Sequence, residues 1–205
     1  PDGLVTGVQT CALPISQPND WVNFIGGDGV AALVDPANGN FLYGEYPSLD
    51  ISYSTTGGPS GQDFTVEPPD ETASPQTANF IAPIALVPNG AQAANQMLAG
   101  GASLWLGSSI QSGSPTWTSF NYSTLPVGSS GNYISTIEVD PNTNNNIWVG
   151  FDDGAVWHTT NGTNPSGPTW SQVGAGALPA NQQVTDIWVV PGQSSTVYVS
   201  FAGFS

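Results

Sequence analysis

The sequence predicts an all-β protein in which one unit of about 50 residues recurs. Gly and Pro supply 25 and 18 of the 205 residues, which suits short strands joined by turns better than long helices. Four segments of alternating apolar residues each end at a proline: Val30–Pro36, Ile81–Pro88, Ile134–Pro141 and Val184–Pro191. These prolines follow one another at intervals of 52, 53 and 50 residues, so the period is regular.

The first strand of each unit is predicted from the residues four and two positions before its proline. These positions hold four apolar pairs: Ala32 and Val34, Ile84 and Leu86, Ile137 and Val139, Ile187 and Val189. Such alternation predicts a strand with one buried face. The proline ends the strand because it has no N–H to donate to the ladder.

Three further strands are predicted after each turn. The second strands are expected at Asn40–Tyr43, Gln96–Ala99, Asn146–Phe151 and Thr196–Phe201. The third strands are expected at Ile51–Thr55, Ser103–Gly107 and Ala155–Thr159, and the fourth strands open on Trp21, Phe64, Trp117 and Trp170. The Asp152-Asp153-Gly154 step predicts a tight hairpin between the second and third strands of its unit. An insertion at residues 91–95 breaks the register of the second unit.

Four short antiparallel strands in about 50 residues are the period of a propeller blade. We therefore predict a β-propeller fragment of about four four-stranded antiparallel blades, from a ring of roughly six to eight. The units are expected at about 30–80, 81–133, 134–183 and, incomplete, 184–205. A β-sandwich would not repeat in this way, and a parallel β-helix would repeat at roughly half this length.

The charge pattern excludes several classes of partner. The chain has no Lys or Arg against 15 Asp and Glu, for a formal charge of −15. It therefore lacks the cations that bind nucleic acid or an anionic membrane surface, and it has no apolar run long enough for membrane insertion. One cysteine, Cys11, makes no disulfide framework. A single histidine, His158, makes no zinc site.

The first sixteen residues are predicted to be an artefact rather than native sequence. Val5–Ile15 resembles translated sequencing-library adapter in eleven consecutive residues. We expect the native segment to begin near Gln17 and Cys11 to carry no chemistry. The partial propeller then occupies residues 17–205.

The repeats resemble the Asp-box propellers, also called BNR-repeat proteins, which include sialidases, xyloglucan-cleaving glucanases and sortilin-type receptors. Their box reads Ser/Thr-x-Asp-x-Gly-x-x-Trp in the turn between the third and fourth strands. The matching stretches are residues 54–58 with Phe64, 107–113 with Trp117 and 159–162 with Trp170, and all three lack the box Asp in its place. Sialidases of this family hold a carboxylate with arginines, so these blades alone build no sialidase site.

The resemblance implies that ligands bind at the face formed by the loops between strands 4 and 1 and between strands 2 and 3. The acidic residues expected there are Asp28, Glu45, Asp50, Asp70, Glu71, Asp152 and Asp153, with the tyrosines Tyr46, Tyr122 and Tyr133. Asp28 and Glu45 are the candidate catalytic carboxylates, since a glycosidase needs two across a cleft; the alternative for Asp28 is a turn that caps backbone N–H groups.

Tyr46, Tyr133 and Asp152 are the candidate ligand-binding residues on that face. Asp152 and Asp153 are also the candidate calcium ligands, with hairpin formation as the alternative. No other cofactor is expected.

The predicted function is that of an exported recognition propeller, outside the cell or on its surface, that binds a polysaccharide or an extracellular protein. One alternative is a glycoside hydrolase whose site needs blades beyond these four. A second is a structural repeat of an extracellular adhesin or filament. The remainder of its own propeller is a further expected partner.

Overall fold

A computed structural model describes residues 28–57, 64–65, 68–69, 77–121, 124–162, 164 and 166–203. The predicted adapter segment and native start, together with Trp21, Asp70, Glu71 and Tyr122, lie outside the described residues. The described chain is all-β apart from one 3₁₀ turn at Ile110–Ser112. No helix in this part of the chain is long and apolar enough to cross a bilayer.

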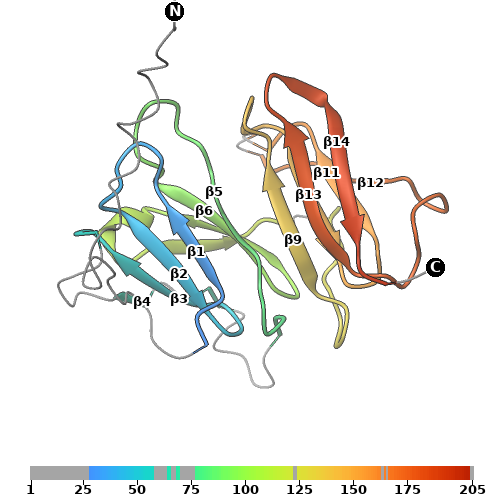
Figure 1. The fold of residues 1–205 in the computed structure, drawn as a ribbon, viewed down its shortest axis with the longest axis horizontal. Coiled ribbons are helices and arrows are strands. Elements are labelled where there is room, and N and C mark those ends of the chain that lie inside the picture. Colours follow the sequence, from blue (N-terminus) through green and yellow to red (C-terminus); the bar gives the residue numbers. More distant parts are fainter. Residues whose placement is uncertain are drawn as a thin grey trace, which may run out of the picture.

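The strands form sheets that follow one another along the chain, from blue to red in Figure 1. Three sheets have four antiparallel strands and the last has two. We call them blades 1 to 4. Blade 1 contains β1 (Ala31–Val34), β2 (Leu42–Tyr46), β3 (Asp50–Ser54) and β4 (Phe64–Thr65). Blade 2 contains β5 (Ile84–Leu86), β6 (Gln96–Gly100), β7 (Leu104–Ser108) and β8 (Thr116–Ser119).

Blade 3 contains β9 (Ile134–Val139), β10 (Ile147–Phe151), β11 (Val156–Thr159) and β12 (Ser171–Val173), and blade 4 contains β13 (Val184–Val190) and β14 (Gln193–Phe201). Within each blade the strands pair in chain order. The first strands of successive blades contact one another, β1 with β5, β5 with β9 and β9 with β13. The first strands are therefore innermost, as in a β-propeller, and the predicted fold class is confirmed.

The core lies between blades, where apolar side chains of one sheet pack on the next. Ile84, Met97 and Ala99 of blade 2 pack against Tyr43 and Ile51 of blade 1. The same positions of blade 3 pack against blade 2, and those of blade 4 pack against blade 3. The fold thus repeats one interface three times.

The apolar pairs before the prolines are buried in blades 3 and 4, and in blade 2 Ile84 is buried while Leu86 is half-buried. Ile137 and Val139 are buried, as are Ile187 and Val189. In blade 1 this expectation is wrong: Ala32 is exposed and Val34 is 59% exposed. The physical reason is that the pair lies on the outer side of the first described blade, where no preceding described blade packs against it.

Candidate functional site

The loops between strands 4 and 1 and between strands 2 and 3 lie at one end of the blades, and we call this end the loop face. Most candidate residues lie on it. Asp152 and Asp153 form the turn between β10 and β11, where Gly154, at φ 90°, donates its N–H to the carbonyl of Phe151 over 3.1 Å. Only glycine adopts this conformation readily, so the hairpin is the one that the sequence indicates.

Glu45 lies at the end of β2 and is completely buried. Its Oε1 accepts the N–H of Leu49, at 3.2 Å, and that of Ala82 at the entry to blade 2, at 3.4 Å. Ser48 and Leu49 have φ values of 70° and 74°, in the left-handed region that non-glycine residues rarely occupy. The carboxylate therefore holds an unusual turn and ties blade 1 to blade 2.

The two candidate catalytic carboxylates differ in accessibility. Asp28 is exposed at the entry to β1, where Val30 donates its N–H to the Glu45 carbonyl over 2.9 Å. The Glu45 side chain instead points into the joint between blades, where a ligand does not reach it. The arrangement expected for glycoside hydrolysis, two carboxylates across an open cleft, is not formed by this pair.

Asp152 connects three blades. Its Oδ1 accepts from Asn79 Nδ2 at 3.0 Å and from Gln183 Nε2 at 2.8 Å, and its Oδ2 accepts from the backbone N–H of Tyr133 at 2.9 Å. Each donor lies just before the first strand of a different blade. Asp152 is therefore a clamp on the loop face, with three of its acceptor positions already used.

Asp153 extends this clamp. Its Oδ1 accepts the Ala155 N–H at 2.9 Å and its Oδ2 accepts from Asn132 Nδ2 at 3.0 Å. Its carbonyl accepts the N–H of Asn181 at 2.7 Å. The described residues contain no group of three or more His, Cys, Asp or Glu side chains placed to hold a metal ion, so calcium binding by Asp152 and Asp153 stays a prediction.

The two described candidate tyrosines differ in accessibility. Tyr46 is 38% exposed at the end of β2, close to the half-buried Asp50 with which it pairs across the hairpin. Tyr133 is half-buried beside Asp152. The Tyr46 side chain is thus more accessible to a ligand than that of Tyr133, whose backbone N–H bonds Asp152.

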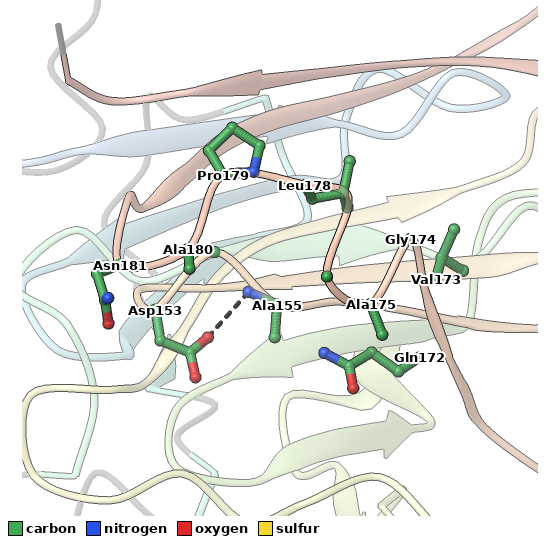
Figure 2. Close-up of a pocket in the computed structure, with 12 residues that line it drawn as sticks. Asp153, Ala155, Gln172, Val173, Gly174, Ala175, Leu178, Pro179, Ala180 and Asn181 are labelled. Atoms are coloured by element: carbon green, nitrogen blue, oxygen red, sulfur yellow. Dashed lines mark hydrogen bonds between the residues drawn. The ribbon is translucent and has the colours of Figure 1, made fainter. Parts of the chain in front are cut away.

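A hollow of about 240 Å³ opens on the loop face of blade 3 (Figure 2). The loop from Gly174 to Asn181 runs around it, with Asp153 and Asn181 at one end and Gln172 at the other. Leu178 and Pro179 supply its apolar wall. The hollow lies beside the outermost strand, β12, so it is at the rim of the blade and away from Asp28 at the entry to the innermost strand, β1.

The hollow is suited to a neutral polar ligand. The amides of Gln172 and Asn181 each offer donors and an acceptor, and the Asp153 carboxylate adds an acceptor. Lys and Arg, the side chains that bind anionic groups most readily, are absent. Sequence reasoning missed Gln172 and Asn181 because single amides in turns carry no recognisable motif.

The opposite end of the blades uses its carboxylates in the same structural way. Asp35 is buried, and its Oδ2 accepts the N–H of Ala94 in blade 2 at 2.5 Å. Burial alone would raise the pKa of Asp140, but hydrogen bonds from Ser194, Asn146 and Asn142 outweigh this effect and lower the pKa. Asp35 and Asp140 therefore replace the missing salt bridges with carboxylate bonds to neutral donors.

The turns that resemble the Asp-box also join strands that are distant in sequence. Gly57 donates its N–H to the Asn40 carbonyl at 3.0 Å, and Gly162 donates to the Asn145 carbonyl at 2.9 Å. In blade 3, Asn161 Oδ1 accepts the Thr159 hydroxyl at 2.7 Å and the Thr169 N–H at 2.8 Å. The side-chain amide oxygen of Asn161 therefore stabilises this turn.

No protein-family model matches this chain, and no curated protein matches it either. Solved structures do match. A structure of an ancestral GH74 enzyme superposes with a TM-score of 0.54 and 20% identity, over 88% of this chain and 22% of that one. A GH74 enzyme of Niastella koreensis superposes with a TM-score of 0.57 and 21% identity, over 85% of this chain and 26% of that one.

The chain thus spans about a quarter of the length of the structures it matches. At this identity the likeness concerns the fold, and the fold it shows is that of a β-propeller.

Proposed function

We propose that these blades belong to an exported propeller that recognises carbohydrate. The observation that supports the proposal best is the fold likeness to two GH74 enzymes, a glycoside hydrolase family, over 85% and 88% of this chain. Those enzymes are roughly four times as long as this chain, so their substrates and partners belong to much larger proteins. For the present chain, carbohydrate is therefore the ligand class to test first.

The hollow on blade 3 supports the same ligand class. Sugar rings present hydroxyl groups for amides and carboxylates, and C–H faces for apolar walls. Gln172, Asn181 and Asp153 match the hydroxyls, and Leu178 matches the C–H faces. The absence of Lys and Arg favours a neutral glycan over one that carries carboxylates or sulfates.

Hydrolysis is the second candidate function, favoured because both similar structures are of enzymes. Among the described residues, Asp28 is the exposed carboxylate at the entry to β1, and Glu45 is covered by blade 2. A hydrolase would therefore need a second carboxylate other than Glu45. If no glycan binds, two hypotheses remain: the blades bind an extracellular protein, or they have a structural role in an adhesin or filament.

The binding proposal is tested by titration calorimetry with neutral glucan and xyloglucan oligosaccharides. We expect a saturable heat with the wild type. A double variant, Gln172→Ala with Asn181→Gly, is expected to weaken binding about tenfold or more, because two hydrogen bonds of about 1 kcal/mol each are lost. Glycine is chosen at position 181 because Asn181 has a φ of 57°.

Gln92→Ala is the matched control, since Gln92 is an exposed amide in the turn between β5 and β6, at the opposite end of the blades. It is expected to bind like the wild type. Absence of heat from every neutral oligosaccharide would refute carbohydrate recognition by these blades. Equal loss in the control would show that the hollow is not the site.

The hydrolysis alternative is tested by release of reducing sugar from the same glucans. If Asp28 is catalytic, Asp28→Asn abolishes turnover while binding persists. Turnover that is unchanged in Asp28→Asn would exclude Asp28 from catalysis. Export is tested separately, by whether the intact protein is recovered from the culture medium of its producing cell or from the cytoplasm alone.

A further inference from the structure

Three Asn-Gly pairs lie in turns of this chain, and the structure holds them to different degrees. They are Asn38-Gly39, Asn89-Gly90 and Asn161-Gly162. In such a pair the backbone nitrogen of the glycine can attack the side-chain carbonyl carbon of the asparagine, because glycine has no Cβ to obstruct the approach and its backbone is the least restricted. The reaction requires an asparagine side chain that can turn toward the main chain and a glycine N–H that is not hydrogen-bonded.

The pair in blade 3 is held on both sides of the reacting bond. Asn161 Oδ1 accepts the Thr159 hydroxyl at 2.7 Å and the Thr169 N–H at 2.8 Å. The Gly162 nitrogen, which would be the nucleophile, donates its proton to the Asn145 carbonyl at 2.9 Å. Both residues are half-buried. Nucleophile and electrophile are therefore fixed, and three hydrogen bonds must open before they can react.

The pair in blade 2 has none of these restraints on its nucleophile. Asn89 and Gly90 lie in the turn between β5 and β6, and both are exposed. Within the described part of the chain the Gly90 N–H has no hydrogen-bond acceptor, and nothing lies within 4 Å of where a Cβ on Gly90 would be. The Asn89 side chain makes one long hydrogen bond, from Nδ2 to the Ala93 carbonyl at 3.4 Å. The side chain and the glycine nitrogen are thus both free to move.

We propose that Asn89 is a site of spontaneous deamidation. The Gly90 nitrogen loses its proton to hydroxide from the solvent and attacks Cγ of Asn89, and the new C–N bond closes a succinimide ring. The Cγ–Nδ2 bond breaks, and the side-chain nitrogen takes up a proton from water and leaves as ammonia. Water then opens the ring at either carbonyl, which gives aspartate or isoaspartate at position 89. The reaction needs no oxidant or reductant.

The pair in blade 1 is expected to react at an intermediate rate. Asn38 and Gly39 are exposed, and a Cβ on Gly39 would also meet nothing within 4 Å. However, Asn38 Oδ1 accepts the Asn40 N–H at 3.1 Å, and this bond restrains the side chain. The expected order of conversion is therefore Asn89, then Asn38, then Asn161.

Deamidation of Asn89 changes the chemistry of a hollow of about 240 Å³ where blade 2 meets the turn between β9 and β10. Asn89 lines this hollow with Asn95, Gln96 and Asn144, whose side chains are all neutral amides. Each event adds one negative charge to a chain whose formal charge is already −15. Isoaspartate also adds a methylene group to the main chain of the turn. The neutral hollow therefore becomes anionic as the protein ages.

The experiment is peptide mapping by mass spectrometry after the whole chain has been kept for days in mildly alkaline buffer. The chain has no Lys or Arg, so trypsin cannot cleave it, and chymotrypsin is used instead. The mass gain from replacement of NH₂ by OH identifies each converted asparagine. Asn89 is expected to convert at least about tenfold faster than Asn161, because each hydrogen bond that must open adds to the barrier.

Asn89→Gln retains the amide but would have to close a larger ring. This variant is expected to lose the fast conversion, while Asn38 and Asn161 convert as in the wild type. Circular dichroism checks that it folds.

The same chain unfolded in urea is the control for effects of neighbouring sequence. Without the folded hydrogen bonds, the three pairs are expected to convert at similar rates. If Asn161 converts as fast as Asn89 in the folded chain, the proposal is wrong. A difference between Asn89 and Asn161 that persists unchanged in urea would also overturn it, because local sequence and not the fold would then set the rates.

Discussion

Two joints between neighbouring blades are filled in different ways. The joint between blades 1 and 2 contains a charged side chain, whereas the joint between blades 3 and 4 contains a glycine. Nine residues after the closing proline, blade 1 has Glu45 and blade 3 has Gly150. Glu45 fills the joint with a buried carboxylate that binds the N–H groups of Leu49 and Ala82. Gly150 leaves the joint open, and Val184 approaches so closely that a Cβ at position 150 would lie 2.6 Å from its Cβ.

The comparison shows that the fold requires a filled joint and not a particular residue. Where Gly150 admits an apolar neighbour, the polar connection moves to Asp152, which accepts from Gln183 at 2.8 Å. Where Glu45 occupies the joint, the carboxylate makes the connection itself. The two joints should therefore fail in different ways: the first through unsatisfied hydrogen bonds and the second through steric overlap.

The largest effect is expected from Glu45→Ala. It leaves two buried N–H groups without their acceptor, each at roughly 1–3 kcal/mol, and should lower the free energy of unfolding by about 3 kcal/mol. The measurement is the midpoint of urea unfolding. Glu45→Gln, which retains an acceptor oxygen, should lose markedly less. Equal losses in both variants would mean that the charge of Glu45, and not its hydrogen bonds, holds the joint.

The next effect is expected from Gly150→Ala. The added methyl group would meet Val184 and the Thr136 methyl, the latter at 2.7 Å, and overpacking of this kind costs about 2 kcal/mol. Gly39→Ala is the control because nothing lies within 4 Å of its added Cβ. Thermal unfolding should separate the two variants clearly. A stable Gly150→Ala protein would show that blade 4 shifts on blade 3 at little cost.

The sequence was informative about the blades and less so about these joints. Proline spacing and apolar alternation predicted each first strand, and the Asp152–Gly154 step predicted its hairpin, because these signals depend on local backbone preferences. Glu45 looked like a loop carboxylate available for catalysis. Its burial depends on Ala82, which is 37 residues away along the chain, and such long-range partners are set by how blades pack.

The sequence predicted the location of the candidate site better than it predicted the residues that form it. Asp152 was assigned to the correct loop face, but its role as a clamp depends on Asn79, which is 73 residues away along the chain. Gln172 and Asn181 had no signal in the sequence, because they line one hollow only when the loop after β12 folds back over the hairpin. Val34 was predicted to be buried and is exposed, because alternation predicts an apolar face but not whether a neighbouring blade covers it.

A smaller loss is expected from Asp152→Asn. One carboxylate oxygen becomes an amide NH₂ group, which faces N–H donors whose hydrogen bonds the oxygen had accepted. Because Asp152 is only half-buried, water can hydrogen-bond to some of these donors instead. The free energy of unfolding should fall by about 1 kcal/mol. Asp28→Asn removes the same charge from an exposed position and should leave unfolding unchanged. If both variants behave alike, repulsion within the acidic chain, and not the clamp, governs the result.

The smallest effect is a pH dependence that comes from His158. This ring stacks on Trp148 at 3.8 Å, and its Nε2 has no hydrogen-bond partner among the described residues. Burial lowers the pKa of His158, with Asp140 opposing. The unfolded chain therefore takes up the proton first as the pH falls below about 6.5, and stability declines until the pH reaches the lower folded pKa.

His158→Phe retains a planar ring on Trp148 and removes the titration. Between pH 7 and pH 5 the melting temperature of the wild type should fall relative to that of the variant, while carboxylates that titrate in this range affect both proteins alike. A relative gain of the wild type on acidification would mean that the imidazolium is stabilised over the Trp148 face as a cation–π pair. In that case the aromatic contact, and not desolvation, would control His158, and the joint between blades 3 and 4 would tighten in acid.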